Sequence, residues 1–134
     1  MRRMKGLLTL VFGLLSLAMI SSCKKVEGQG GTSTIKGVVI EQKYIGSNIV
    51  AEYPAADQDI FIIYGADDTF YDDDLKTSYD GSFEFKYLNN GTYKLFVYED
   101  SSTDPSGKAA KMVEVEITNK KSTIEVDTIY IKKI

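Results

Sequence analysis

Alternating apolar and polar residues form the clearest pattern in the second half of the chain. Within the segment SFEFKYL, the aromatic residues Phe83, Phe85 and Tyr87 alternate with Glu84 and Lys86. Strict alternation places successive side chains on opposite faces of a strand, so this pattern predicts a half-buried β-strand whose aromatic residues face a core.

Other segments follow the same pattern or are apolar and β-branched. Asp80-Gly81 and Asn89 to Gly91 supply turn signals, the first of them typical of a hairpin. The segment DIFIIYG is continuously apolar, as expected of a strand covered on both faces. We therefore expect strands within residues 34–42, 59–65, 77–88, 92–99, 111–118 and 122–134, and longer loops over 43–58 and 100–110.

The two following strands have clear inward faces. Tyr93, Leu95 and Val97 share one side of their segment, and Phe96 and Tyr98 share the other. In a later segment Val113, Val115 and Ile117 alternate with glutamates. The last segment changes parity, because Ile124 and Val126 face inward before Asp127-Thr128, and Ile129 and Ile131 after it. This change predicts a β-bulge or kink.

No segment after the first 22 residues shows the 3.6-residue apolar stripe of an amphipathic helix. Short strands separated by turn residues at this spacing indicate an all-β protein. We predict one antiparallel β-sandwich of about seven strands over residues 34–134.

The beginning of the chain is typical of a bacterial lipoprotein precursor. Residues 1–5 carry three basic side chains, and 15 uncharged residues follow, fewer than the roughly 20 that span a membrane. The string ISSC then resembles a lipobox, which implies cleavage before Cys23 and acylation of its thiol. The alternative is an ordinary signal peptide with an incidental cysteine. We expect a signal peptide over 1–22 and a lipidated flexible tether over 23–33.

Composition excludes several kinds of function. The chain has no histidine, and Cys23 is its only cysteine, so the usual zinc sites and histidine-dependent nucleophiles are excluded. The part after the leader keeps all 19 acidic residues and has a net charge of about −6, which argues against nucleic acid as a partner. We expect no enzyme activity and no cofactor.

A family resemblance follows from the order of the motifs. The strings IKGVV, YPAADQDIFI and KTSYDGSFEFKYLNNGTYKLFVYE together resemble the carboxypeptidase regulatory-like domain, a transthyretin-like (prealbumin-like) β-sandwich. The resemblance covers most of residues 34–131, and Asn90 stands where the family often has proline. It implies an accessory module that docks or binds, since the catalytic relatives of this fold rely on histidine. The matching positions are Gly37, Pro54, Ala55, Thr77, Gly81, Phe83, Phe85, Gly91, Tyr93, Leu95 and Val97.

Two groups of residues are weak candidates for binding. An acidic run could attract calcium, although its spacing is not that of an EF-hand, and a solvated loop without a tight calcium site is expected. The run contains Asp67, Asp68, Asp72, Asp73 and Asp74. Phe96 and Tyr98 could form a sugar-stacking or protein-docking patch, or brace neighbouring strands instead.

Two further residues invite covalent chemistry. Lys36 stands on the first strand, where pilin-like sandwiches cross-link a lysine, but Asp127 is its only plausible late partner and an exposed lysine is expected. The string DTI resembles a short O-glycosylation signal at Thr128, and three residues carry little information.

Taken together, the sequence favours a non-catalytic binding or scaffolding lipoprotein of the Gram-negative cell envelope. Lys24 rather than aspartate follows Cys23, so the usual inner-membrane retention signal is absent and the outer membrane is expected. The expected partners are the membrane, through the lipid anchor, and an envelope protein. The alternative function is a glycan-binding accessory lipoprotein of an outer-membrane uptake system.

Overall fold

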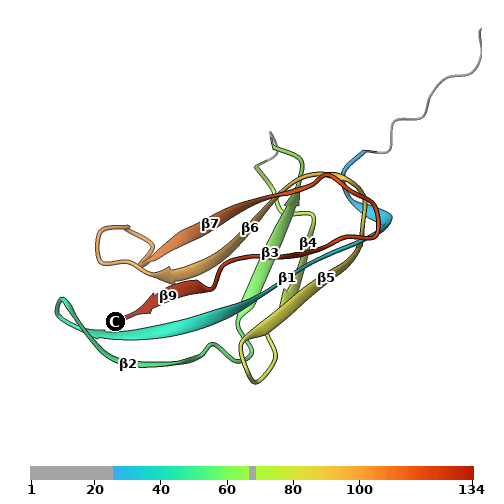
Figure 1. Cartoon of the computed structure of the whole chain (residues 1–134). Helices are drawn as coiled ribbons and strands as arrows, with labels where there is room; N and C mark the ends of the chain where they lie inside the picture. Colours follow the sequence, from blue (N-terminus) through green and yellow to red (C-terminus); the bar gives the residue numbers. More distant parts are fainter. Residues whose placement is uncertain (1–25, 67–68) are drawn as a thin grey trace, which may run out of the picture.

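The computed structural model of the chain describes residues 26–66 and 69–134. These residues form nine β-strands in two facing sheets, and no membrane-spanning helix is found among them. Figure 1 shows the two layers and the long hairpin that projects from one end. The all-β sandwich expected from the alternation is confirmed, with nine strands rather than about seven.

The strands divide between the sheets as follows. The first sheet contains β1 (Gln29–Ile45), β2 (Asn48–Pro54), β5 (Ser82–Leu88), β8 (Thr123–Glu125) and β9 (Ile129–Lys133). The second sheet has the order β4 (Asp73–Lys76), β3 (Asp59–Tyr64), β6 (Gly91–Asp100) and β7 (Lys108–Ile117).

Strand β1 organises the first sheet because it is long enough to pair with four partners. Its first half lies between β5 and β8, and its second half between β2 and β9. Both β8 and β9 run parallel to β1, whereas the other pairs among the described strands are antiparallel. The predicted antiparallel sandwich is therefore confirmed, with parallel pairing added where the two C-terminal strands join β1.

The core lies between the sheets and consists mainly of the inward residues that alternation predicted. Tyr93, Leu95 and Val97 on β6 are fully buried, and Val115 and Ile117 on β7 are nearly so. The first sheet contributes Ile35 and Val39 from β1, Phe83, Phe85 and Leu88 from β5, and Ile129 and Ile131 from β9.

Two strands lie where loops were expected. Strand β2 occupies the middle of the predicted 43–58 loop, and six of its seven residues are exposed. Strand β4 begins at Asp73, inside the acidic run, and pairs with β3. Strand β2 was missed because an exposed edge strand needs no apolar face. Strand β4 was missed because its four residues contain one apolar side chain, Leu75, which packs against the core but is too little for a periodic signal.

The Asp80-Gly81 turn forms, but it does not close a hairpin. Ser78 and Ser82 are joined by a backbone hydrogen bond of 2.8 Å, and Gly81 has a positive φ of 78°. A side chain at Gly81 would lie 2.3 Å from the carbonyl oxygen of Val39. The strands on either side, β4 and β5, belong to different sheets, so the turn carries the chain from one layer to the other.

Strand β5 departs from its alternation at Tyr87, which was expected to face inward. Tyr87 is 70% exposed and has a φ of 62°, while Leu88 is buried in its place. Gln29 and Ser33 of β1 both pair with Leu88, so the ladder is irregular there. Residues 30–32 of β1 lie between these two pairings, so the ladder is bulged at the end of β5. At this point Tyr87 and Leu88 exchange the sides that alternation predicts.

The parity change in the last segment corresponds to a break between two strands. Strand β8 ends at Glu125, and β9 begins at Ile129. Val126 still donates a backbone hydrogen bond of 2.9 Å to Lys36. The predicted kink at Asp127-Thr128 is confirmed.

The sandwich begins earlier in the chain than the boundary expected at residue 34. Strand β1 starts at Gln29, Ser33 is fully buried, and the backbone N–H of Gly28 donates to the hydroxyl of Tyr93 at 2.9 Å. The tether expected over 23–33 is thus wrong for residues 29–33, which are part of the fold. Cys23 lies outside the described residues.

Candidate functional site

Four aromatic rings gather on the outer face of the second sheet. Phe61 and Phe96 stack with ring centroids 4.8 Å apart and an angle of 15° between their planes. Tyr98 meets both rings edge-on, at 5.8 and 5.6 Å, and Tyr71 meets Phe61 at 4.9 Å. We call these four residues the aromatic cluster.

Strand register explains why these residues meet. Phe61 on β3 and Phe96 on β6 are directly opposite each other in the antiparallel ladder. Their neighbours Ile62 and Leu95 face the core, so both phenylalanines face away from it. Cross-strand aromatic pairs of this kind stabilise a sheet by roughly 0.2–1 kcal/mol.

Exposure separates the members of the cluster. Phe96 is only 7% exposed, whereas Tyr98 is 45% and Tyr71 53% exposed. Phe96, a sequence candidate for ligand contact, therefore supports the surface from below, and Tyr98 remains available. The sequence did not single out Tyr71, because it lies within the acidic run and its nearness to Phe61 depends on how the β3–β4 connection folds back.

The chemistry of the cluster is that of an apolar contact surface with phenol groups at its edge. The two phenylalanines turn ring faces toward each other, so those faces are already engaged. The tyrosines add apolar ring surface and hydroxyls that can donate or accept hydrogen bonds. Such a surface can bind a partner through ring contacts and phenol hydrogen bonds.

The acidic run does not form a metal site among the described residues. Asp72 accepts the backbone N–H of Tyr64 at 2.6 Å, and Asp73 accepts the side-chain amide of Gln29 at 3.1 Å. No three potential ligands converge in residues 26–66 and 69–134, while Asp67 and Asp68 lie outside these ranges. Burial raises the pKa of the Tyr64 phenol, and Asp73 and then Asp72 raise it further.

The two residues considered for covalent chemistry have ordinary surroundings. The ammonium of Lys36 lies 3.7 Å from a carboxylate oxygen of Glu125, its cross-strand partner on β8. Asp127 and Thr128 are both exposed in the break between β8 and β9. This ion pair is consistent with the exposed position expected for Lys36. Glycosylation of Thr128 stays a prediction.

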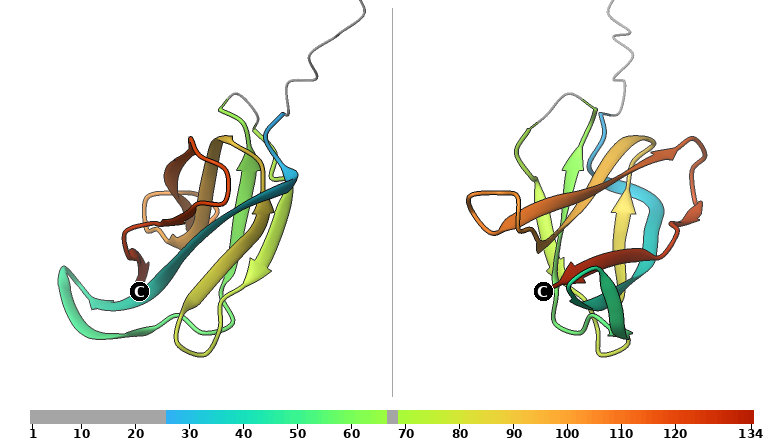
Figure 2. Two further views of the ribbon diagram at one scale, coloured as in Figure 1. Left: turned by 45° about the vertical axis from the view of Figure 1, so that its right-hand side comes forward. Right: turned by 90° about the vertical axis from the view of Figure 1, so that its left-hand side faces the viewer.

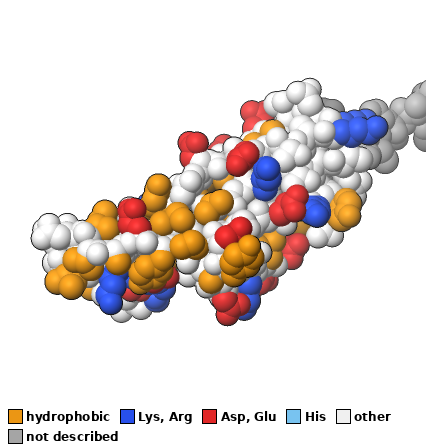
Figure 3. Space-filling view, turned by 60° about the horizontal axis from the view of Figure 1, so that its bottom comes forward, with side chains coloured by type: hydrophobic (Ala, Val, Ile, Leu, Met, Phe, Trp, Pro, Cys, Tyr) orange, Lys and Arg blue, Asp and Glu red, His pale blue; other side chains and the backbone are white. Residues whose placement is uncertain are grey.

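A second exposed apolar region lies on the hairpin formed by β1 and β2. Ile45, Ile49, Val50 and Tyr53 are between 42% and 66% exposed. Figure 3 shows apolar side chains interspersed with charged ones toward this projecting end. Charged and apolar side chains are mixed there, and no aromatic ring pair is found among the described residues of the hairpin.

Neither the known family models nor the curated proteins include a match to the chain. A candidate carbohydrate-binding protein from Pseudomonas aeruginosa has a similar structure, with 14% identity, a TM-score of 0.48, and coverage of 79% of this chain and 91% of that one.

Two further solved structures are similar over part of their length. A minor pilin of Streptococcus agalactiae has 23% identity and a TM-score of 0.44, with coverage of 78% of this chain and 46% of the pilin. An (S)-allantoin synthase has 11% identity and a TM-score of 0.37, with coverage of 75% and 42%. At these scores the likenesses carry no argument about function.

Proposed function

We propose that the chain is a non-catalytic lipoprotein of the Gram-negative cell envelope whose sandwich binds an envelope protein through the aromatic cluster. The observation that carries this proposal is the exposure of Tyr98 and Tyr71 above two phenylalanines that hold them in place. Rigid, exposed tyrosines give a large contact area at low entropic cost.

Anchoring in the outer membrane through acylated Cys23 is part of the same proposal. It is supported by the short uncharged run and by the ISSC string. Val26 lies only three residues beyond Cys23, and three extended residues span about 10 Å. An acylated Cys23 would therefore hold this end of the sandwich close to the bilayer.

The proposed family is that of the carboxypeptidase regulatory-like domains, and the packing around Gly37 supports it. A side chain at Gly37 would lie 2.6 Å from Val126 and 2.8 Å from the ring of Phe83. The glycine of the IKGVV motif thus permits close packing on β1. The motif is therefore a packing feature of the fold.

A glycan is the second candidate ligand, and one observation favours it. The ring of Tyr98 is tilted by 71° from Phe61 and by 82° from Phe96, so its own faces are not stacked on either. A free tyrosine face can pack against a sugar ring. An uptake system that collects glycans at the outer membrane would use such an accessory lipoprotein.

Site-specific photo-cross-linking in cells tests the leading proposal. The full chain carries p-benzoylphenylalanine in place of Tyr98 or, as a control, of Tyr130, which is 41% exposed on the opposite sheet. We expect a discrete protein adduct from position 98 and none from position 130. The same adduct from both positions, or none from either, would contradict docking through the aromatic cluster.

A glycan array with the full chain in detergent separates the two ligands. If a glycan is the ligand, Tyr98→Ala and Tyr71→Ala should each reduce array binding at least tenfold, whereas Tyr130→Ala should not. Binding that all three variants retain would remove the aromatic cluster as the glycan site. Array binding without a protein adduct would replace the leading function by the glycan-binding one.

A further inference from the structure

The open side of the sandwich between β7 and the β8–β9 segment contains a groove. Its volume is about 440 Å³, and it is lined by Lys111 and residues 113–116 on one side and by residues 124–129 on the other. Figure 2 shows this C-terminal segment crossing from the end of β7 to the first sheet. The groove contains no residue of the aromatic cluster.

Apolar side chains between the sheets form the floor of the groove. Val113 of β7, Ile124 of β8 and Val126 are only partly buried, yet all three pack against the core cluster. Their remaining exposed area faces the gap between the two edges, and burying it would be favourable at about 25 cal/mol per Å².

Strand β7 offers a free backbone edge beside this floor. It has ten residues, and β6 is its only partner among the described strands. An unpaired edge of this length presents alternate N–H and C=O groups that can accept another strand. By contrast, the edge of β9 is occupied, because Glu99 and Asp100 accept the backbone N–H groups of Lys132 and Ile134.

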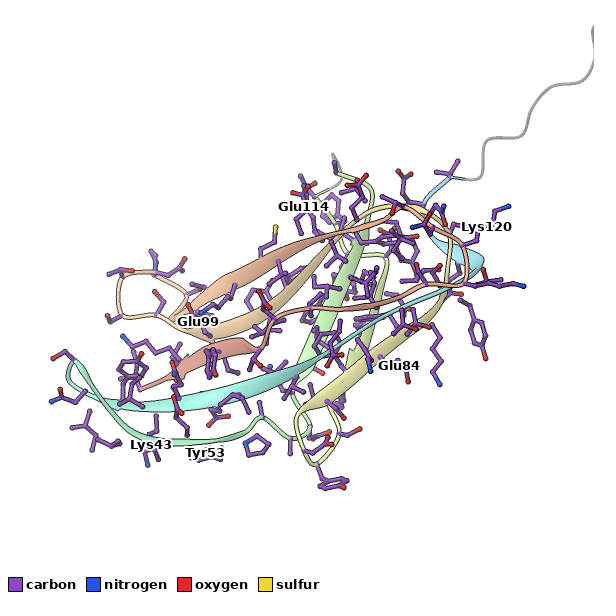
Figure 4. The ribbon with its side chains drawn as sticks, in the orientation of Figure 1. Lys43, Tyr53, Glu84, Glu99, Glu114 and Lys120 are labelled. Carbon is purple, nitrogen blue, oxygen red and sulfur yellow. The ribbon has the colours of Figure 1, made fainter. Side chains whose placement is uncertain are left out.

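The charges along the groove specify what such a strand should carry. Glu114, Glu116 and Asp127 are exposed and have no salt bridge to another described residue, while Lys111 is the only basic side chain of the lining. Glu114 lies at the surface of β7 (Figure 4). Its neighbours in sequence, Val113 and Val115, face the core side, so apolar and acidic residues alternate along this edge.

We propose that this groove binds an extended segment of a partner polypeptide in which apolar and basic residues alternate. Added as a strand beside β7, the segment places its apolar side chains over Val113, Ile124 and Val126. Its basic side chains, on the other face of the sheet, lie beside Glu114 and Glu116. The strand extends the second sheet and closes the open side of the sandwich.

Fluorescence anisotropy with the full chain in detergent tests this. The probe is a labelled nine-residue peptide of alternating valine and lysine. One control peptide has glutamate in place of lysine, and another has the same composition with all lysines at one end. We expect the alternating valine–lysine peptide to bind at least tenfold more tightly than either control.

Peptide N-methylation tests the pairing with β7 without changing the protein. In an extended segment the N–H groups of the valines point to one edge and those of the lysines to the other. Methylation of the N–H groups that face β7 should therefore abolish binding. Methylation of the other set of N–H groups should change the dissociation constant by no more than about twofold. Equal effects of the two modifications would show that the peptide does not bind as a strand.

Substitutions locate the binding on the protein. The double variant Glu114→Gln with Glu116→Gln should weaken binding of the valine–lysine peptide at least tenfold. The matched control, Glu84→Gln with Glu52→Gln on β5 and β2 of the other sheet, removes the same two charges and should leave binding unchanged. If the control weakened peptide binding equally, the attraction would depend only on the net charge of the protein, and the proposal would be overturned. Sedimentation of the unliganded chain as a dimer that the double variant dissociates would make the occupant a second copy, and would also overturn it.

Discussion

Replacement of Tyr93 by phenylalanine tests how the start of the chain is held to the sandwich. The side chain is fully buried, and its hydroxyl accepts the N–H of Gly28 at 2.9 Å and donates to the carbonyl of Asn89 at 2.7 Å. The substitution removes only this oxygen. It leaves the ring and its edge contact with Tyr64, at 5.8 Å, in place.

The expected loss of stability follows from the two hydrogen bonds. Each contributes about 0.5–1.5 kcal/mol, and both former partners lose their hydrogen bond to the hydroxyl inside the fold, so the free energy of unfolding should fall by about 2 kcal/mol. At a urea dependence of about 2 kcal/mol per molar, this lowers the unfolding midpoint by about 1 M.

Urea unfolding combined with amide hydrogen exchange measures the effect. We expect faster exchange at Gly28 in Tyr93→Phe than in the natural chain, beyond the change that global stability explains. Tyr98→Phe is the matched control, because the Tyr98 hydroxyl has no hydrogen bond to the described residues and 45% of the residue is exposed. A loss below about 0.5 kcal/mol with Gly28 still protected would refute the role given to the hydroxyl.

Four further outcomes are expected. Cys23→Ser should leave an uncleaved precursor visible by gel mobility and intact mass, and a normal unlipidated N-terminus at another residue would contradict the anchor. Phe96→Ala should destabilise the fold by about 3 kcal/mol in urea unfolding, because the ring is 93% covered and stacked on a neighbour; a loss below 1 kcal/mol would show that the outer face does not need it. Calorimetry should find calcium binding no tighter than millimolar, and a low-micromolar constant abolished by Asp72→Asn would make the acidic run a site. A hydrogen bond from Lys108, followed by that from the N–H of Ile134, lowers the pKa of the Asp100 carboxyl below its ordinary 3.8. The stability that this carboxylate contributes is therefore present above about pH 4 and is lost as the pH falls through the lowered pKa. In a pH series of thermal unfolding, Asp100→Asn should therefore lose less stability at acid pH than the natural chain does. An unchanged loss would contradict this role of Asp100.

The sequence predicted those strands whose alternation depends on the core. Tyr93, Leu95 and Val97 are buried as expected because one face of β6 packs against the opposite sheet. Strand β2 could not be found in this way, since its residues are exposed and it exists because β1 continues beyond the core. Its only local signal is the turn at Gly46, which has a φ of 62°.

Contacts distant in sequence decide the features that sequence reasoning missed. Tyr87 follows the alternation of β5, but the irregular pairing of Leu88 with Gln29 and Ser33 turns it outward. The Asp80-Gly81 pair predicts the turn correctly, but it does not indicate which sheet the next strand joins.

The aromatic cluster, too, could be predicted from the sequence only in part, because it depends on contacts between distant segments. Tyr98 was a sequence candidate because it shares the outer side of its strand with Phe96, and alternation alone places both there. Phe61 and Tyr71 join them through strand register and through a connection that folds back, and neither can be read from spacing. Burial of Phe96 likewise depends on its cross-strand partner.

The pairing of β1 with four neighbours has a mechanical consequence. The chain enters the domain at the start of this strand, and the strand is flanked on both edges along much of its length. A pull on the N-terminus therefore runs along the strand axis and loads many backbone hydrogen bonds together, in shear, instead of opening them one after another. Tension applied at the N-terminus would therefore act through β1 on β2, β5, β8 and β9 together, and the load would be shared by the whole first sheet.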